Sequence, residues 1–490
     1  MIRGITAGAA ALLLSACASV QSVPSNPPPP SLDAVETALA RDIPTLSDDG
    51  FGGRFPGSEG EAKTRSWLID RYSDIGLQPG VGEGDWTQDF TLVRRAPLGK
   101  PGESTATITR GTRSVSLSQG LIAVQPGEDE ARLADVPIVG LDPDLKELQP
   151  RSLVNRALAL PASSLFKLFP QFEAAGPKVL LIMTADEEEY QKTAAMISRG
   201  RWRLASDTSG PAVMLLTPQD SEQLMDVVGQ NASRHPDGLG VIAYDTILKA
   251  SIAQQVDRIE TANVIGRMPG KVPGAGAVLV LAHWDHLGDA CGPADAKDRL
   301  CNGAVDNASG LAVMIEAVRI ALRDGPLDRD VIVLATSSEE LGLLGAKAFV
   351  ADPPVPLPTI AAAFNLDTMA IAPRGTPVVV LGAGKTQLDY GISEVARVQG
   401  REVVPSDMQD AFLPRQDGWI LLRDGVPTVL VSSALADTGA FESFMQGPYH
   451  HANDDTASGL ELGGAAQDTL LHADLLRYFG NLATYPGSGE

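Results

Sequence analysis

The chain has 490 residues, which is long enough for two or three domains. Hydrophobic residues make up 44% and charged residues 20%, a balance typical of a globular protein and not of a disordered or fibrous one. The 39 Lys and Arg against 61 Asp and Glu give a net charge of −22, which repels phosphate backbones and excludes nucleic acid as a partner.

The first residues are predicted to direct export. Residues 1–16 carry one charge, Arg3, ahead of an apolar stretch over 5–14 that is typical of a signal peptide and too short to span a membrane. Small residues then lead into Cys17, as at the cleavage site of bacterial lipoproteins, although an ordinary signal peptide with an incidental cysteine is the alternative. The proline-rich segment 17–31 is expected to be an extended tether. We therefore expect an exported lipoprotein, anchored by a lipid and facing the periplasm from the outer membrane of a Gram-negative bacterium.

Three segments are predicted beyond the tether. Residues 32–121 begin with a helical pattern over 61–75, which Gly76 ends, and continue with strand-like stretches. Residues 122–245 differ in character, because strand candidates there are separated by proline and charged segments, and they are expected to form an inserted domain. Residues 246–490 are expected to complete the domain that 32–121 begins. The acidic run 186–189 within the insertion is expected to be a solvated face.

From residue 261 onward, strand candidates alternate with helical patterns over 308–323 and 341–350. This rhythm predicts an α/β fold, a doubly wound, mostly parallel sheet with helices on both faces. The strand candidates are 278–282, 331–335, 361–366, 378–381 and 426–431. Ligands bind at the carboxyl ends of the strands in such sheets, so the polar residues after each strand are the candidate site residues.

Histidines and carboxylates stand at these positions. In chain order they are His283, Asp285, Asp306, Glu339, Glu340, Asp367 and His450. Each has an ordinary explanation when taken alone: Asp306 could cap a helix, Glu339 and Glu340 could complement a helix dipole, and Asp367 could be a turn residue. The chain has only six histidines, however, and four of them lie in two clusters, at 283/286 and 450/451. The joint position of these residues therefore indicates a site.

The chemistry that suits this set is a pair of cations. Five side chains are available as ligands, namely His283, Asp306, Glu340, Asp367 and His450. A bridging Asp would give each ion three protein ligands and leave a position for water. Imidazole together with carboxylate favours Zn²⁺, with Mn²⁺ or Co²⁺ as alternatives. Glu339 is then available as a general base, and Asp285 could accept a hydrogen bond from the imidazole of His283.

Two further pairs of residues belong to this region. We expect neither His286 nor His451 to be a primary ligand, because the five residues above already complete the site. Cys291 and Cys301 are expected to form a disulfide, since an exported protein meets an oxidising compartment, and two buried thiols are the alternative. The disulfide would rigidify the approach to Asp306.

From about Leu46 to the C-terminus, the sequence resembles the zinc metallopeptidases of family M28, most of which are aminopeptidases. The resemblance lies in an ordered series of motifs at 53–58, 262–266, 283–288, 302–310, 339–342, 365–367 and 449–455. One departure is the stretch 415–419, where family members often have Arg-Ser-Asp-His, and it leaves the details of the substrate pocket open.

The resemblance implies a role for each candidate residue. It implies a general acid/base at Glu339 and an orienting residue at Asp285. It also implies two zinc sites that share Asp306, one completed by His283 and Asp367 and the other by Glu340 and His450. Residues 122–245 would correspond to a protease-associated domain. The implied activity is hydrolysis of N-terminal residues from peptides; alternatives are a glutaminyl cyclase-type acyltransferase, a carboxypeptidase and a non-catalytic binding protein.

Overall fold

The computed structural model describes residues 30–487 apart from 83, 99–102, 118–119, 128, 142–146, 229–232, 235–240, 290, 292–294, 448 and 451–454. The predicted signal peptide, the lipid-attachment site Cys17 and almost all of the tether lie outside the described residues. Within the described ranges, no helix has both the length and the apolar character needed to cross a membrane.

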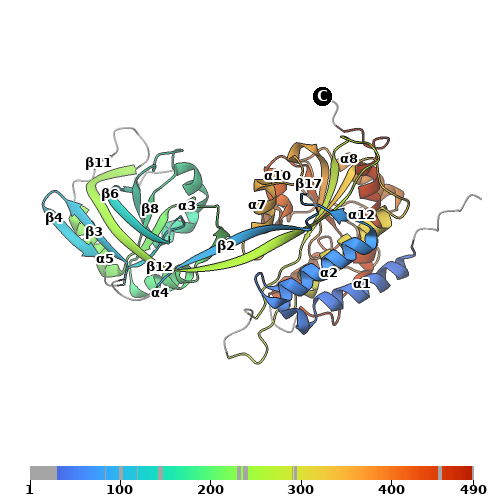
Figure 1. Ribbon diagram of the computed structural model, residues 1–490. Helices are drawn as coiled ribbons and strands as arrows, with labels where there is room; N and C mark the ends of the chain where they lie inside the picture. The colour runs from blue at the N-terminus through green and yellow to red at the C-terminus, as the bar shows by residue number, and fades with distance from the viewer. Residues whose placement is uncertain are drawn as a thin grey trace, which may run out of the picture.

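The structure has two lobes, and two long strands connect them (Figure 1). The strands are β1 (Gln78–Pro79), β2 (Thr87–Pro97), β3 (Thr105–Arg110), β4 (Arg113–Leu117), β5 (Ile122–Val124), β6 (Glu130–Leu141), β7 (Ala157–Pro161), β8 (Val179–Met183), β9 (Arg201–Leu204), β10 (Ala212–Leu215), β11 (Ser233–Arg234), β12 (Val241–Met268), β13 (Ala277–His283), β14 (Asp330–Thr336), β15 (Ile360–Asn365), β16 (Val379–Leu381) and β17 (Thr428–Ser432). The helices are α1 (Leu32–Leu46), α2 (Glu59–Ile75), α3 (Ala162–Ala175), α4 (Glu187–Ser198), α5 (Pro218–Val228), α6 (Gly310–Ala321), α7 (Leu344–Ala351), α8 (Asp389–Val398), α9 (Gln409–Phe412), α10 (Gly418–Arg423), α11 (Thr438–Gln446) and α12 (Leu462–Gly480).

The larger lobe confirms the predicted α/β fold class. Its central strands, in the order β14-β13-β15-β17, are parallel, and helices cover both faces of the sheet. The strands outside them, β12 beside β14 and β16 beside β17, pair in the antiparallel direction, as does β2 beside β12. The prediction of a mostly parallel sheet therefore holds for the centre only, because an apolar run indicates a strand but not its direction.

Alternate residues of the central strand β13 enter two different cores. Val278 and Val280 pack in the core that includes α6 and α12, whereas Leu279 and Leu281 pack in the core that includes α7 and α10. All four side chains are fully buried. A strand covered on both faces needs apolar residues at every position, which is why its sequence is a continuous apolar run.

The smaller lobe is built around a second sheet that includes β3, β4, β6, β7, β8, β10 and the first part of β12. Its extent differs from the predicted insertion over 122–245. The second sheet already begins at Thr105, and β12 continues across residue 245 to pair with β2 from Gln254 onward. The sequence did not show these limits, because a strand that passes from one sheet to another has no break in its pattern.

Several predicted helices lie where the patterns indicated. The helix predicted over 61–75 is α2, which Ser58 caps and Gly76 ends with a φ of 88°. The helices predicted over 308–323 and 341–350 begin later, at Gly310 and Leu344, because the residues before them form the turns of the candidate site. The acidic run starts α4, where Asp186 accepts from the backbone N–H of residue 189.

Candidate metal centre

The predicted site residues meet at the carboxyl edge of the large sheet. His283 is the last residue of β13, and Asp367 follows the end of β15 by two residues. Glu340 lies in the turn after β14, Asp306 lies in the short turn that precedes α6, and His450 follows α11. Segments separated by more than 160 residues therefore converge, because parallel strands bring their carboxyl ends to one edge.

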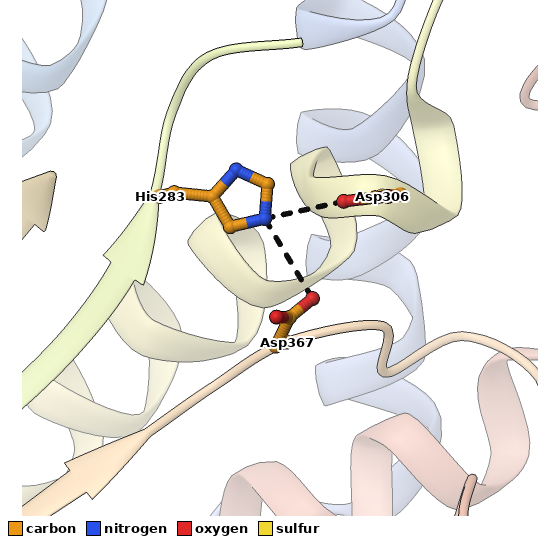
Figure 2. A group of neighbouring side chains, drawn as sticks. All are labelled: His283, Asp306 and Asp367. Atoms are coloured by element: carbon orange, nitrogen blue, oxygen red, sulfur yellow. Dashed lines mark ion pairs between the residues drawn. The ribbon is translucent and has the colours of Figure 1, made fainter. Parts of the chain in front are cut away.

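The first group consists of His283, Asp306 and Asp367 (Figure 2). Nε2 of His283 lies 3.1 Å from Oδ1 of Asp306 and 3.7 Å from Oδ1 of Asp367. One ligand atom from each residue lies within 4.8 Å of the others, so the three side chains could hold one ion.

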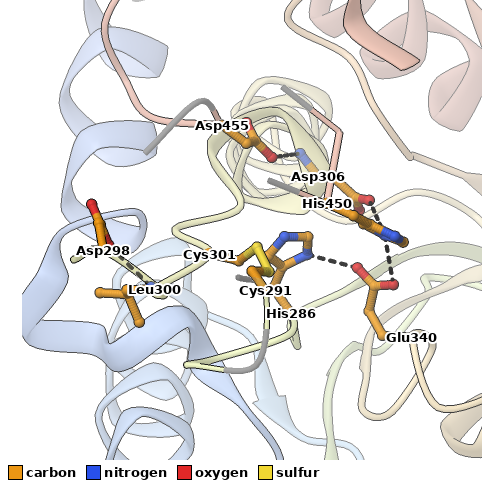
Figure 3. The surroundings of a disulfide bond; sticks show 9 residues. All are labelled: His286, Cys291, Asp298, Leu300, Cys301, Asp306, Glu340, His450 and Asp455. Carbon is orange, nitrogen blue, oxygen red and sulfur yellow. Dashed lines mark hydrogen bonds and ion pairs between the residues drawn. A yellow bond between two sulfur atoms is a disulfide. The ribbon is translucent and has the colours of Figure 1, made fainter. Parts of the chain in front are cut away.

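The second group faces the other oxygen of Asp306 (Figure 3). Nε2 of His450 lies 3.6 Å from Oδ2 of Asp306 and 3.0 Å from Oε2 of Glu340. Asp306 thus presents one carboxylate oxygen to each group, the arrangement that a bridging ligand requires. A further residue is present that the sequence prediction placed outside the ligand set: Nδ1 of His286 lies 2.6 Å from Oε1 of Glu340. His451 lies outside the described residues.

The donor atoms fit zinc. Oδ1 of Asp306, Oε1 of Glu340, Nε2 of His450 and both ring nitrogens of His286 are buried and make no directed hydrogen bond, although all but Nε2 of His286 lie 2.6–3.1 Å from another donor atom of the cluster. Such atoms are almost always paired in folded proteins, so their concentration here indicates that a bound group pairs them. Imidazole nitrogens with carboxylate oxygens are characteristic zinc donors.

The cluster strongly favours positive charge. Burial opposes protonation of His283, but its contacts with Asp285, Asp306 and Asp367 outweigh burial and raise its pKa well above the ordinary value. Burial also opposes protonation of His450, yet Asp306 and Glu340 raise its pKa to about 9. Divalent cations would displace these protons and interact with the same carboxylates.

Asp285 acts on the turn that carries Glu339 and Glu340. Its carboxylate accepts hydrogen bonds from the backbone N–H groups of Glu339, at 3.0 Å, and Glu340, at 3.3 Å. The expected contact with His283 is made mainly by the backbone, since Nδ1 of His283 lies 3.1 Å from the carbonyl oxygen of Asp285 and 3.7 Å from its carboxylate. Asp285 therefore links the loop after β13 to the loop after β14.

Glu339 faces the same cavity as the first group. It lines a cavity of about 80 Å³ together with His283, Asp306 and Asp367. Burial is the largest cause that raises the pKa of Glu339 well above its ordinary value; His283 opposes the shift, and neighbouring carboxylates add to it. A carboxyl group with a raised pKa beside such a cavity suits proton transfer.

The rest of the cavity lining is mixed. It includes the apolar side chains Leu381, Phe412, Phe441 and Met445 as well as Arg415 and Gln416. Asp417, from the stretch that departs from the family pattern, is buried nearby and accepts a hydrogen bond from the Thr336 hydroxyl at 2.5 Å. Burial raises the pKa of Asp417 to about 7.

Arg54 and Asp455 hold the loops of the site in place, a role that the sequence did not reveal although both lie in motifs of the resemblance. The fully buried guanidinium of Arg54 donates to the backbone carbonyls of residues 46, 284, 302 and 303 at 2.7–2.9 Å. The carboxylate of Asp455 accepts from the backbone N–H groups of Val305, at 2.7 Å, and Asp306, at 3.2 Å. The only sequence signal was the place of these residues in the motifs.

The expected disulfide between Cys291 and Cys301 is present. The backbone N–H of Cys301 also donates to the carbonyl of Gly288 at 2.8 Å. The residues directly after Cys301 are those whose carbonyls accept from Arg54. The disulfide thus closes the loop that runs from His286 to the turn that holds Asp306 (Figure 3).

The fold and this centre define an α/β protein with a candidate site for two metal ions. Residues 263–473 match the model for Peptidase family M28, and this range includes every candidate ligand. The family match supports a metal-dependent peptidase.

Individual relatives are more distant. Aminopeptidase YwaD of Bacillus subtilis (strain 168) is 35% identical over 89 residues, which cover 18% of this chain and 17% of that protein. Among solved structures, an aminopeptidase from Aneurinibacillus sp. strain AM-1 is 17% identical, with 91% of this chain and 94% of that chain covered and a TM-score of 0.49. The zinc aminopeptidase BSAP from Bacillus subtilis is 17% identical, with coverages of 92% and 96% and a TM-score of 0.47. A glutaminyl cyclase from Bacteroides thetaiotaomicron is 11% identical, with coverages of 93% and 100% and a TM-score of 0.43.

Proposed function

We propose that the protein is an exopeptidase that uses two zinc ions and removes N-terminal residues from peptides, with Glu339 as the general base. The observation that carries this proposal is the position of Asp306, whose two carboxylate oxygens face two separate groups of potential ligands. The family match over residues 263–473 supports the peptidase class.

The residues of the site would have different roles in peptide hydrolysis. When bound, zinc ions supply the Lewis acidity that polarises a carbonyl group and lowers the pKa of water. Glu339 would take a proton from the attacking water and deliver it to the amine nitrogen that leaves. Asp285 would hold Glu339 in place through the backbone hydrogen bonds described above. The acidic groups around the cavity would attract the free amine of the substrate, and the apolar residues of its lining would receive an apolar side chain.

Substitution of the adjacent residues Glu339 and Glu340 tests the proposed roles. We expect Glu339→Gln to retain zinc but lose at least about 10²-fold in turnover, because the amide cannot accept the proton. Glu340→Gln, the matched variant, should instead lose zinc. Zinc content is measured by elemental analysis, and turnover is measured with aminoacyl chromogenic substrates. Hydrolysis by Glu339→Gln at the wild-type rate would contradict the assignment of the base.

The alternatives on the same site are separated by substrate. A panel of free, amine-blocked and carboxyl-blocked dipeptides, with and without a chelator, distinguishes an aminopeptidase from a carboxypeptidase. A peptide with N-terminal Gln tests for the glutaminyl cyclase reaction, in which the N-terminal amine attacks the side-chain amide, ammonia leaves, and no peptide bond is cut. Cleavage only of amine-blocked dipeptides would overturn the proposed aminopeptidase polarity.

We also propose that the protein is exported and anchored through a lipid on Cys17, in the outer membrane of a Gram-negative bacterium. The support is the sequence of residues 1–31. Labelling with a fatty-acid analogue should mark the wild type and not Cys17→Ala, and the variant should leave the membrane fraction.

We further propose that the smaller lobe corresponds to a protease-associated domain that controls access of substrates. Its deletion should change the preference of the enzyme for long over short peptides.

A further inference from the structure

We propose that His286 is a ligand of the second ion, together with Asp306, Glu340 and His450. This inference rests on the proposed two-ion centre and adds to it a residue that the motif-based ligand set does not contain. It assigns different tasks to the two ions.

The first argument is the sparse pairing of the His286 ring. The side chain is fully buried, Nε2 has no hydrogen-bond partner, and Nδ1 faces the Glu340 carboxylate at a distance of 2.6 Å. Among the histidines in the described part of the chain, the buried His283 and His472 each have a backbone carbonyl near Nδ1, at 3.1 and 2.8 Å. Nδ1 of His286 has no such backbone acceptor and stands beside a carboxylate, so it could bind a metal ion together with Glu340.

The second argument is the position of Nδ1. It lies 2.6 Å from Oε1 of Glu340, and a ligand oxygen of Asp306 completes a group whose atoms lie within 4.8 Å of one another. Glu340 therefore stands between two imidazoles, with Oε1 toward His286 and Oε2 3.0 Å from Nε2 of His450 (Figure 3). The rings of His286 and His450 are 5.7 Å apart and inclined at 58°, so the two rings converge on one carboxylate.

The third argument is that the surroundings fix the ring. A side chain at Gly303 would place its Cβ 2.6 Å from Cγ of His286, so only glycine leaves room for the imidazole there. The carbonyl of Gly303 accepts from Arg54 at 2.8 Å, which holds this segment against the ring. Restricted movement of this kind is what a preorganised ligand requires.

The consequence is a division of labour between the ions. Four protein ligands saturate a tetrahedral zinc, as in structural sites, whereas three leave one position open, as in catalytic sites. The ion beside His283 and Asp367 would have three protein ligands and would lie beside Glu339. The ion beside His286 would be held more tightly and would mainly fix Asp306 and Glu340.

The test is metal binding by His286→Ala and His286→Asn, with His472→Gln as the control for loss of a buried histidine elsewhere. Binding of Zn²⁺ is measured by competition with a chromogenic chelator, and Co²⁺ absorption reports the coordination of each ion. We expect two equivalents in the wild type and the control. Both His286 variants should weaken the tighter site by more than about 100-fold and alter only its Co²⁺ spectrum.

Two outcomes would overturn the inference while leaving the two-ion centre intact. One is wild-type affinity and an unchanged Co²⁺ spectrum in His286→Ala. The other is full recovery in His286→Asn, which would show that a hydrogen bond to Glu340 is sufficient. Fewer than two equivalents in the wild type would instead refute the two-ion centre and this inference with it. Near-ultraviolet circular dichroism confirms that each variant is folded.

Discussion

Replacement of Arg54 by Met should both destabilise the large lobe and weaken metal binding. The guanidinium joins three segments, namely the end of α1, the loop after β13 and the turn before Asp306, through four hydrogen bonds to backbone carbonyls. Met fills much of the same volume but donates nothing. The loops that carry the two groups of ligands would then lose their common support.

The size of the effect follows from these contacts. Four hydrogen bonds from a charged donor contribute about 1.5–3 kcal/mol each, so their sum is about 6–12 kcal/mol. Burial opposes the charge and lowers the pKa of Arg54 to about 10, which corresponds to a cost of about 3 kcal/mol. The net effect is the sum of the hydrogen bonds minus the cost of burying the charge. Because such hydrogen bonds are not additive, we expect a loss near the lower end of this net range, about 3–5 kcal/mol in the free energy of unfolding.

Urea unfolding of the zinc-free protein, followed by tryptophan fluorescence, measures this loss. Four of the five tryptophans, all except Trp202, lie outside residues 122–245, so the signal reports mainly on the large lobe. Arg329→Met is the matched control, because Arg329 is also buried and donates to the carbonyls of residues 479 and 485 far from the site. Equal destabilisation of both variants, with wild-type zinc affinity in Arg54→Met, would refute the reasoning.

Three more changes test neighbouring features. Asp285→Asn keeps one acceptor oxygen and replaces the other with an NH2 group, so it loses one of the two hydrogen bonds from backbone N–H groups. Turnover should fall by about 10–100-fold while zinc content is largely kept, as kinetic assays and elemental analysis would show. Burial raises the pKa of Asp417 to about 7, so the unfolded chain ionises this group at a lower pH than the folded protein does. The free energy of unfolding of the zinc-free wild type in urea should therefore fall between pH 5 and 8 by about 3 kcal/mol more than that of Asp417→Asn. Parallel curves for the two proteins would contradict this. Replacement of Cys291 and Cys301 by Ser should cost about 3 kcal/mol of stability, since the disulfide closes a short loop, and should weaken zinc binding; unchanged zinc affinity and activity would show that the loop needs no disulfide.

Much of the larger lobe follows from local patterns. The continuous apolar runs at β13, β14 and β15 could be recognised because strands buried on both faces need apolar residues throughout. Polar residues directly after such runs could be placed at one edge of a sheet, which predicted that His283 and Asp367 are neighbours, and the start of the next helix added Asp306; the structure brings all three together. The limits of the smaller lobe could not be recognised, since β12 serves both sheets without a break in its pattern.

The sequence alone determines which residue types are available to bind a metal and in which order the loops that carry them occur. Both can be recognised because residue type and the end of a strand are local features of the chain. Which side chains meet is decided only when separate loops pack together. His286 lies three residues after His283 and was expected to be surplus, yet the packing of Gly303 and Arg54 turns its ring toward Glu340. That contact depends on loops brought together across the sheet edge, so no local pattern could encode it.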